Sequence, residues 1–116
     1  MTPRQIEDYL QDILDAILAS QQFTAGMSFE EFAADQKTIF AVTRAIEIVG
    51  EATKSISQPL RSTYPQIPWK SIAGMRDKVI HQYFGVNLQV LWDTVQQDLP
   101  ALQPVIAHML NDLSNP

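Results

Sequence analysis

One short run, Arg76-Asp77-Lys78-Val79-Ile80-His81-Gln82-Tyr83, contains the side chains best suited to chemistry in this chain. An arginine presents a planar fork of donors that matches two phosphate oxygens and stays charged at physiological pH. A histidine takes and gives a proton near neutrality. Arg76 and His81 therefore suit cleavage of a phosphodiester, in which one histidine deprotonates a ribose 2′-hydroxyl and a second histidine protonates the leaving 5′-oxygen.

The spacing within this run favours a site shared by two chains. At 100° per residue, Arg76 and Tyr83 share one helix face, and Asp77 and His81 share another. Arg76 and His81 lie about 140° apart around the helix, so they border one groove. Two copies of this helix related by a two-fold axis would line one cleft with two arginines and two histidines. Asp77 can hydrogen-bond His81 and set its tautomer.

Plainer interpretations of the same run stay open from the residues alone. A histidine on a helix beside aromatic residues is often packed or exposed, Arg76 with Asp77 can be ordinary surface charge, and Tyr83 can fill the core. His108, the other histidine, has no arginine or hydroxyl neighbour in the sequence and is predicted to be structural or exposed. Because the chain has two histidines and no cysteine, we predict no metal site and no cofactor.

Charge is distributed unevenly along the 116 residues, whose formal net charge is −5. Residues 1–51 carry −6 and residues 93–116 carry −3, whereas residues 52–92 carry +4. The overall acidity argues against sequence-independent binding of nucleic acid. The basic block contains the run described above, and within it Lys70 and Lys78 are candidates for binding RNA. Chance clustering of solvated charges is the alternative.

Apolar residues recur at helical spacing along most of the chain, and no stretch alternates as a half-buried strand does. This pattern predicts an all-α protein, an antiparallel up-and-down bundle of four to five helices that forms a single domain over residues 1–116. The predicted helices cover residues 3–21, residues 29–56, residues 69–84 and a last segment that Asn87 caps.

Several residues mark where the first two helices begin and bend. Ser28 and Glu31 have the spacing of a capping box. The apolar periodicity slips near Ala34-Asp35, where a break is expected. Gly50 lies inside the helical pattern and predicts either a kink or the close approach of another helix.

Prolines shape the second half of the chain. They predict a loop over residues 57–68, with room for one short turn, and a kink or restart of the last helix at Pro100 and Pro104. Trp69 and Trp92 are predicted to anchor the core. The N-terminus lacks a signal-peptide pattern and no apolar run approaches the roughly 20 residues of a membrane span, so we expect a cytoplasmic protein.

The motif Arg76-x-x-x-x-His81-x-Tyr83 resembles the signature of the HEPN superfamily and, more closely, of its HepT-like branch. The resemblance extends over nearly the whole chain. Residues 65–75 look like the segment that leads into the motif, and residues 46–52 resemble the central helix of that branch. The closing helix is matched by Val86, Trp92, Leu99 and Pro100.

This resemblance implies a HEPN-like helical bundle that acts as a homodimer and cleaves RNA without a metal ion. Arg76 would bind and polarise the scissile phosphate, and His81 would transfer protons. The branch consists of ribonuclease toxins encoded beside a minimal nucleotidyltransferase antitoxin. Tyr83 matches the tyrosine that the antitoxin modifies with AMP, a bulky anionic group that would occupy the phosphate site.

Asp77 departs from the branch, whose members commonly carry asparagine or another polar residue there. Its carboxylate could orient His81 but also brings negative charge toward RNA, which is expected to lower the rate. Two alternatives to the endoribonuclease toxin remain. One is a non-catalytic subunit that presents a nucleotide or substrate to a partner nucleotidyltransferase, and the other is a helical dimerisation module with a decayed site.

Overall fold

The computed structural model describes residues 4–79 and 87–115, and these residues form helices joined by short turns, with no strand among them. This confirms the all-α fold class. In chain order the elements are α1 (Ile6–Thr24), α2 (Phe29–Ala33), α3 (Gln36–Lys54), α4 (Gln58–Thr63), α5 (Trp69–Ala73), α6 (Met75–Val79), α7 (Leu88–Asp93), the π-helical turn η2 (Thr94–Asp98) and α8 (Leu99–Ser114).

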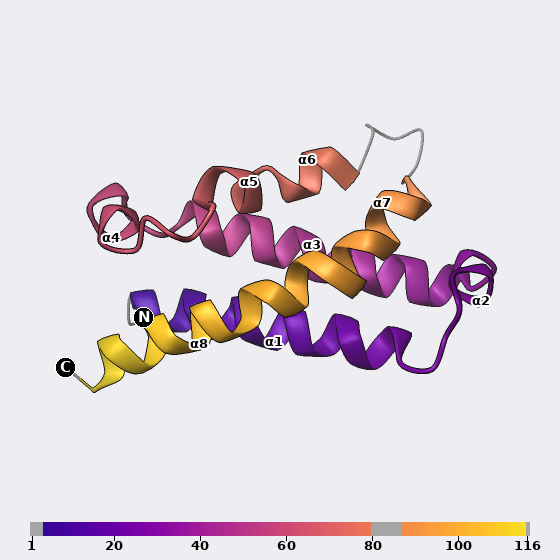
Figure 1. The fold of residues 1–116 in the computed structure, drawn as a ribbon, viewed down its shortest axis with the longest axis horizontal. Helices are drawn as coiled ribbons and strands as arrows, with labels where there is room; N and C mark the ends of the chain where they lie inside the picture. The colour runs from indigo at the N-terminus through magenta and orange to yellow at the C-terminus, as the bar shows by residue number, and fades with distance from the viewer. Residues whose placement is uncertain (1–3, 80–86, 116) are drawn as a thin grey trace.

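The two long helices α1 and α3 run antiparallel and pack along their lengths (Figure 1). Helix α8 crosses α1, so both chain ends lie at the same end of the molecule. Helices α5 and α6 lie on the side of α3 that faces away from α1 (Figure 1). The short helix α2 packs on α3 and α7, and thereby closes the other end of the bundle.

The core lies where α1, α3 and α8 meet. Its side chains recur at three- and four-residue spacing, so each helix buries one stripe. Complete burial of an aliphatic or aromatic side chain contributes about 1.5–3 kcal/mol to folding. The fully buried large residues include Leu10, Ile13 and Ile17 of α1, Phe32 of α2, Val42, Ile46 and Val49 of α3, and Leu99, Ile106 and Met109 of α8.

The break expected near Ala34-Asp35 is confirmed, because α2 ends there and α3 begins anew. Asp35 is the N-cap of α3, and its carboxylate accepts from the Thr38 amide at 3.3 Å and from the Thr38 hydroxyl at 2.9 Å. The capping box at the start of α2 is also confirmed, since Ser28 and Glu31 exchange backbone-to-side-chain bonds of 3.0 and 3.1 Å.

The segment expected as a loop over residues 57–68 contains a short helix, α4. Arg61 ties it to the end of α3 by donating to the carbonyls of Thr53 at 2.7 Å and Ile56 at 3.0 Å. The indole of Trp69 then donates to the carbonyls of Arg61 and Tyr64, both at 3.0 Å. Trp69 is 8% exposed, which confirms it as a core anchor.

The helix predicted over residues 69–84 is divided at Gly74, and this expectation of one continuous helix was wrong. Gly74 caps α5 with φ −89° and ψ 1°, after which α6 begins. Glycine is a poor helix former, and both short helices pack on α3, so tertiary contacts decide the bend. The part of the prediction beyond Val79 lies outside the described residues.

The last helix is interrupted just before Pro100, where the prolines predicted a kink or restart, and α8 begins at Leu99. In the wider turn η2, the Leu99 amide donates to the Thr94 carbonyl five residues earlier, just before the proline that lacks an N–H. Helix α8 continues through Pro104, so the restart that was also expected there does not occur. Among the described helices, none is both long and apolar enough to span a bilayer.

The Asp35 cap makes part of the stability depend on pH. Thr38 donates to the Asp35 carboxylate and lowers its pKa. The stabilisation by this cap is therefore present above the ordinary pKa of an aspartate and is lost as the pH falls through the lowered pKa of Asp35. Asp35→Asn keeps an acceptor but does not titrate. We expect the melting-temperature advantage of the unaltered chain over Asp35→Asn to shrink between pH 6 and pH 3. An unchanged difference would contradict this.

Candidate active site

Helix α6 presents the first half of the motif at the surface. Met75 and Val79 are 8% and 0% exposed and hold the helix to the core, while Arg76, Asp77 and Lys78 face solvent. The position of Arg76 is therefore set by the burial of the two residues that flank the charged ones.

Gly50 of α3 lies directly beneath Arg76. A Cβ atom at this glycine would stand 3.5 Å from the Ala73 carbonyl oxygen and 3.8 Å from the Cβ of Arg76. The backbones of α3 and of the α5–α6 junction thus meet with no side chain between them. Of the two outcomes predicted for Gly50, the structure shows close approach.

The side chain of Arg76 is exposed to solvent. Its Nη1 lies 3.5 Å from Oδ1 of Asp77, and the two side chains are 45% and 72% exposed. An exposed ion pair of this length contributes little to the stability of the fold. The other donors of the fork form no hydrogen bond with the residues that the structure describes. The contact predicted between Asp77 and His81 lies outside the described residues, as do His81 and Tyr83 themselves.

The chain on both sides of that segment is fixed. The Asn87 amide donates to the Val79 carbonyl at 3.1 Å, so the last residue of α6 is joined to the cap of α7. Helix α7 is held in turn by Trp92, whose ring packs against Phe29 at 6.2 Å and Phe32 at 5.1 Å between centroids. These contacts confirm Trp92 as a core anchor.

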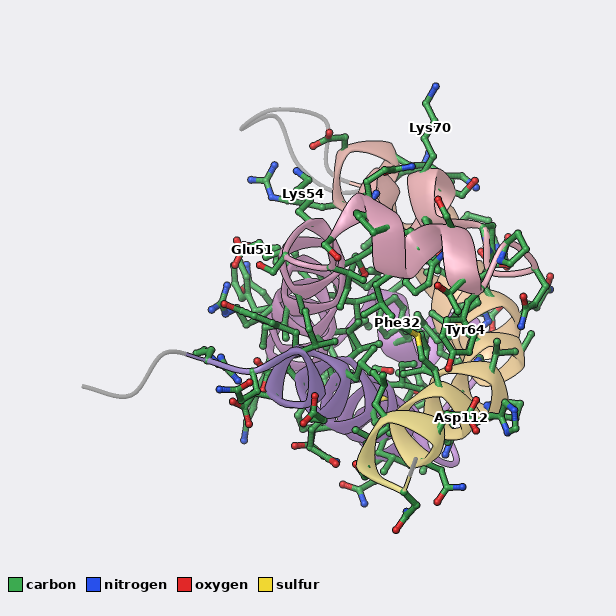
Figure 2. The ribbon with its side chains drawn as sticks, turned by 90° about the vertical axis from the view of Figure 1, so that its left-hand side faces the viewer. Phe32, Glu51, Lys54, Tyr64, Lys70 and Asp112 are labelled. Atoms are coloured by element: carbon green, nitrogen blue, oxygen red, sulfur yellow. The ribbon has the colours of Figure 1, made fainter. Side chains whose placement is uncertain are left out.

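Lys70 and Lys78, the two candidates for binding RNA, line one groove of about 660 Å³ between α5–α6 and η2–α8. Figure 2 shows Lys70 extending into solvent from the edge of the molecule, with Lys54 on the neighbouring side. Arg76 is not part of this groove. Sequence reasoning missed the opposite wall, which includes Gln97 and Asp98, because no local pattern brings residues nearly thirty positions apart together.

His108 is 69% exposed and its Nε2 lies 3.4 Å from Asp112, which also accepts a 3.0 Å bond from the Tyr64 hydroxyl. Figure 2 shows this pairing of Tyr64 with α8. Burial and the neighbouring Asp112 raise the pKa of Tyr64. His108 is thus an exposed residue in a structural contact, as predicted. In residues 4–79 and 87–115, no cluster of three or more histidine and carboxylate side chains is placed to hold a metal ion.

Gly50 offers a direct test of the close approach. The distances of 3.5 Å and above leave ordinary contact room for one methyl group, so Gly50→Ala should raise the free energy of unfolding by about 0.5–1 kcal/mol through helix propensity. Gly50→Leu should lower it by about 1–3 kcal/mol because the longer side chain must displace α6. Urea unfolding measures both changes.

Gly26 provides the matched control. Its φ of +77° is a left-handed conformation that alanine adopts poorly, so Gly26→Ala should destabilise the chain although nothing crowds the site. Destabilisation by Gly50→Ala equal to that of Gly26→Ala would contradict the proposed packing.

The sequence was compared with known proteins. A family model described as Ribonuclease HepT-like matches residues 13–109. A probable ribonuclease HepT of Thermococcus cleftensis is 51% identical over 100 residues, which cover 86% of this chain and 91% of that protein. No solved structure gives a significant match.

Two further relatives cover almost the whole chain. A putative RNase of Methanocaldococcus jannaschii is 40% identical over 113 residues, 97% of this chain and 93% of that protein. A putative RNase of Caldanaerobacter subterraneus is 40% identical over 109 residues, 94% of this chain and 95% of that protein. The resemblance and the enzyme class inferred from the motif are thereby confirmed: this chain belongs to the HepT-like ribonuclease family.

Proposed function

We propose that this chain is an endoribonuclease that cleaves RNA without a metal ion, in a composite site between two copies of itself. The observation that carries the proposal is Arg76, whose backbone is packed on Gly50 while its guanidinium is exposed, in a chain of the HepT-like ribonuclease family. Arg76 would bind two oxygens of the scissile phosphate and stabilise the charge that develops on them.

His81 supplies the proton transfers of this proposal. One imidazole removes the proton from the ribose 2′-hydroxyl, and the 2′-oxygen then forms a bond to phosphorus. The bond from phosphorus to the 5′-oxygen breaks, and a second imidazole protonates that oxygen. The products are a 2′,3′-cyclic phosphate and a 5′-hydroxyl. Each chain contributes one His81, so this sequence of steps needs two chains.

The face formed by α1 and α3 suits the association of two copies. The three large hydrophobic side chains most exposed among the described residues, Leu18, Phe23 and Phe40, all lie on these helices at 42%, 44% and 67% exposure. Phe23 also lines a hollow between these helices, and exposed apolar surface of this kind suits a protein interface. We infer that a second copy covers it.

A hollow of about 590 Å³ lies between α1 and α3, and four of the residues that line it are alanines. Asp15 lies on the α1 edge and Arg44 on the α3 edge, so a two-fold arrangement can pair opposite charges. The small residues that line the hollow are Ala16, Ala19, Ala41 and Ala45.

Helix α3 connects this face to the active site. Ile48 borders the hollow, and Gly50, two residues later, supports Arg76. These two residues are about 200° apart around α3, so a contact between copies that extends around this helix would bring the two copies of Arg76 toward one cleft. We further propose that the protein is a cytoplasmic toxin, that a minimal nucleotidyltransferase is its antitoxin partner, and that attachment of AMP to Tyr83 blocks the phosphate site by charge and volume.

Cleavage of a single-stranded RNA in the presence of EDTA tests the chemistry. Arg76→Ala and His81→Ala should each reduce the rate by about 100-fold or more, with the circular dichroism spectrum unchanged. His108→Ala is the matched control and should cleave at the normal rate, because that histidine serves a structural contact. Undiminished cleavage by His81→Ala would refute the proposal. Absence of cleavage by the unaltered chain, together with binding of a nucleotidyltransferase, would favour the non-catalytic subunit.

The shared site makes a separate prediction. Phe40→Asp should yield a monomer by light scattering and abolish cleavage, because it places a charge in the apolar face. Ala107→Asp, a matched change at an exposed position of α8, should leave the dimer and the activity intact.

In a purified heterodimer of one unaltered chain and one His81→Ala chain, a single cleft that needs both histidines gives almost no cleavage. Half the normal activity would show two independent sites and contradict the mechanism.

A further inference from the structure

The groove between α5–α6 and η2–α8 exists because its two walls are packed on different parts of the bundle. Helices α5 and α6 rest on α3, whereas η2 and α8 rest on α1. The walls diverge and leave about 660 Å³, within the roughly 300–1,000 Å³ typical of small-ligand sites. Its apolar lining comes from Ile67, Pro68, Ile72, Met75, Leu102 and Val105.

We propose that this groove is a nucleotide subsite, which holds a base of the RNA on the far side of α6 from the scissile phosphate. This inference rests on the proposed ribonuclease function. It assigns a binding place to a part of the RNA that Arg76 does not contact. An aromatic base has an apolar face, and the groove offers buried apolar surface, with Ile72 and Met75 only 3% and 8% exposed.

The charges of the groove indicate the orientation of the nucleotide. Lys70 and Lys78 both stand on the α5–α6 wall, are exposed, and form no ion pair with a described carboxylate. They attract the phosphate backbone to that wall. The opposite wall carries Gln97 and Asp98, whose amide and carboxylate can bond the polar edge of a base. The backbone would therefore follow α6, and the base would point toward α8.

Helix α6 joins the subsite to the reacting phosphate. Lys78 follows Arg76 by two residues, which is about 200° around the helix, so the two cations lie on opposite sides of α6. Arg76 stands on the α3 side, close to Gly50, and Lys78 on the groove side. An RNA strand that crosses this short helix meets both, with α6 between the scissile phosphate and the bound base.

A binding experiment separates this subsite from the catalytic residues. The His81→Ala chain leaves RNA uncut, and fluorescence anisotropy with a labelled single-stranded oligonucleotide measures its affinity. In that background Ala101→Phe, which fills the groove from α8, should weaken binding about tenfold. Lys78→Glu should weaken it by a similar factor and reduce the salt dependence by about one phosphate contact.

Two matched variants control for bulk and for charge. Ala107→Phe adds the same ring to an exposed part of α8 outside the groove, and Lys37→Glu makes the same charge change at the start of α3. Both should bind RNA like the His81→Ala parent, and all variants should show the same oligomeric state by light scattering.

Three results would overturn the subsite. If Ala101→Phe and Lys78→Glu bind like their controls while Arg76→Ala abolishes cleavage, the ribonuclease function stands and the groove has no part in it. If Ala101→Phe leaves RNA affinity unchanged but prevents co-purification of a co-expressed nucleotidyltransferase, the groove binds a protein. If neither the unaltered chain nor the His81→Ala chain binds or cleaves RNA, the proposed function itself fails and the subsite fails with it.

Discussion

The candidate site depends on the close approach of α5 and α6 to α3 at Gly50. Of the five residues of α6 that the structure describes, three are charged and exposed. Burial of Met75 and Val79 and direct backbone packing on α3 hold it in place. Arg76 consequently combines a fixed backbone with an exposed guanidinium. A phosphate-binding arginine needs this combination, because an ordered backbone limits the entropy lost when the ligand binds.

Electrostatics then limits where an anion can bind on this chain. The net charge of −5 repels a polyanion over most of the surface. Within the basic block, Arg61 bonds the carbonyls at the end of α3 and stabilises the fold. The remaining cations, Lys54, Lys70, Arg76 and Lys78, belong to the end of α3 and to α5–α6. Attraction is thus confined to the neighbourhood of one short helix.

The α1–α3 face and the groove beyond α6 lie on different sides of the molecule. The α1–α3 face carries the most exposed apolar side chains, which suits a second copy of the chain. The groove beyond α6 carries lysines around an apolar floor, which suits a nucleotide. Arg76 lies between the two, so the proposed dimer would leave a path along α6 for a strand of RNA.

The sequence by itself determined the fold class, the capping box at Ser28, the break before Asp35 and the restart at Pro100, because each follows from local periodicity or from hydrogen bonds between near neighbours. It also singled out Arg76, Lys70 and Lys78 by residue type and spacing. Only the tertiary structure decided the bend at Gly74, the structural use of Arg61, and the groove between α5–α6 and η2–α8 that Lys78 lines. These features arise from contacts between segments distant in the sequence. At Gly74, packing of α5 and α6 on α3 overrides the local preference for one continuous helix.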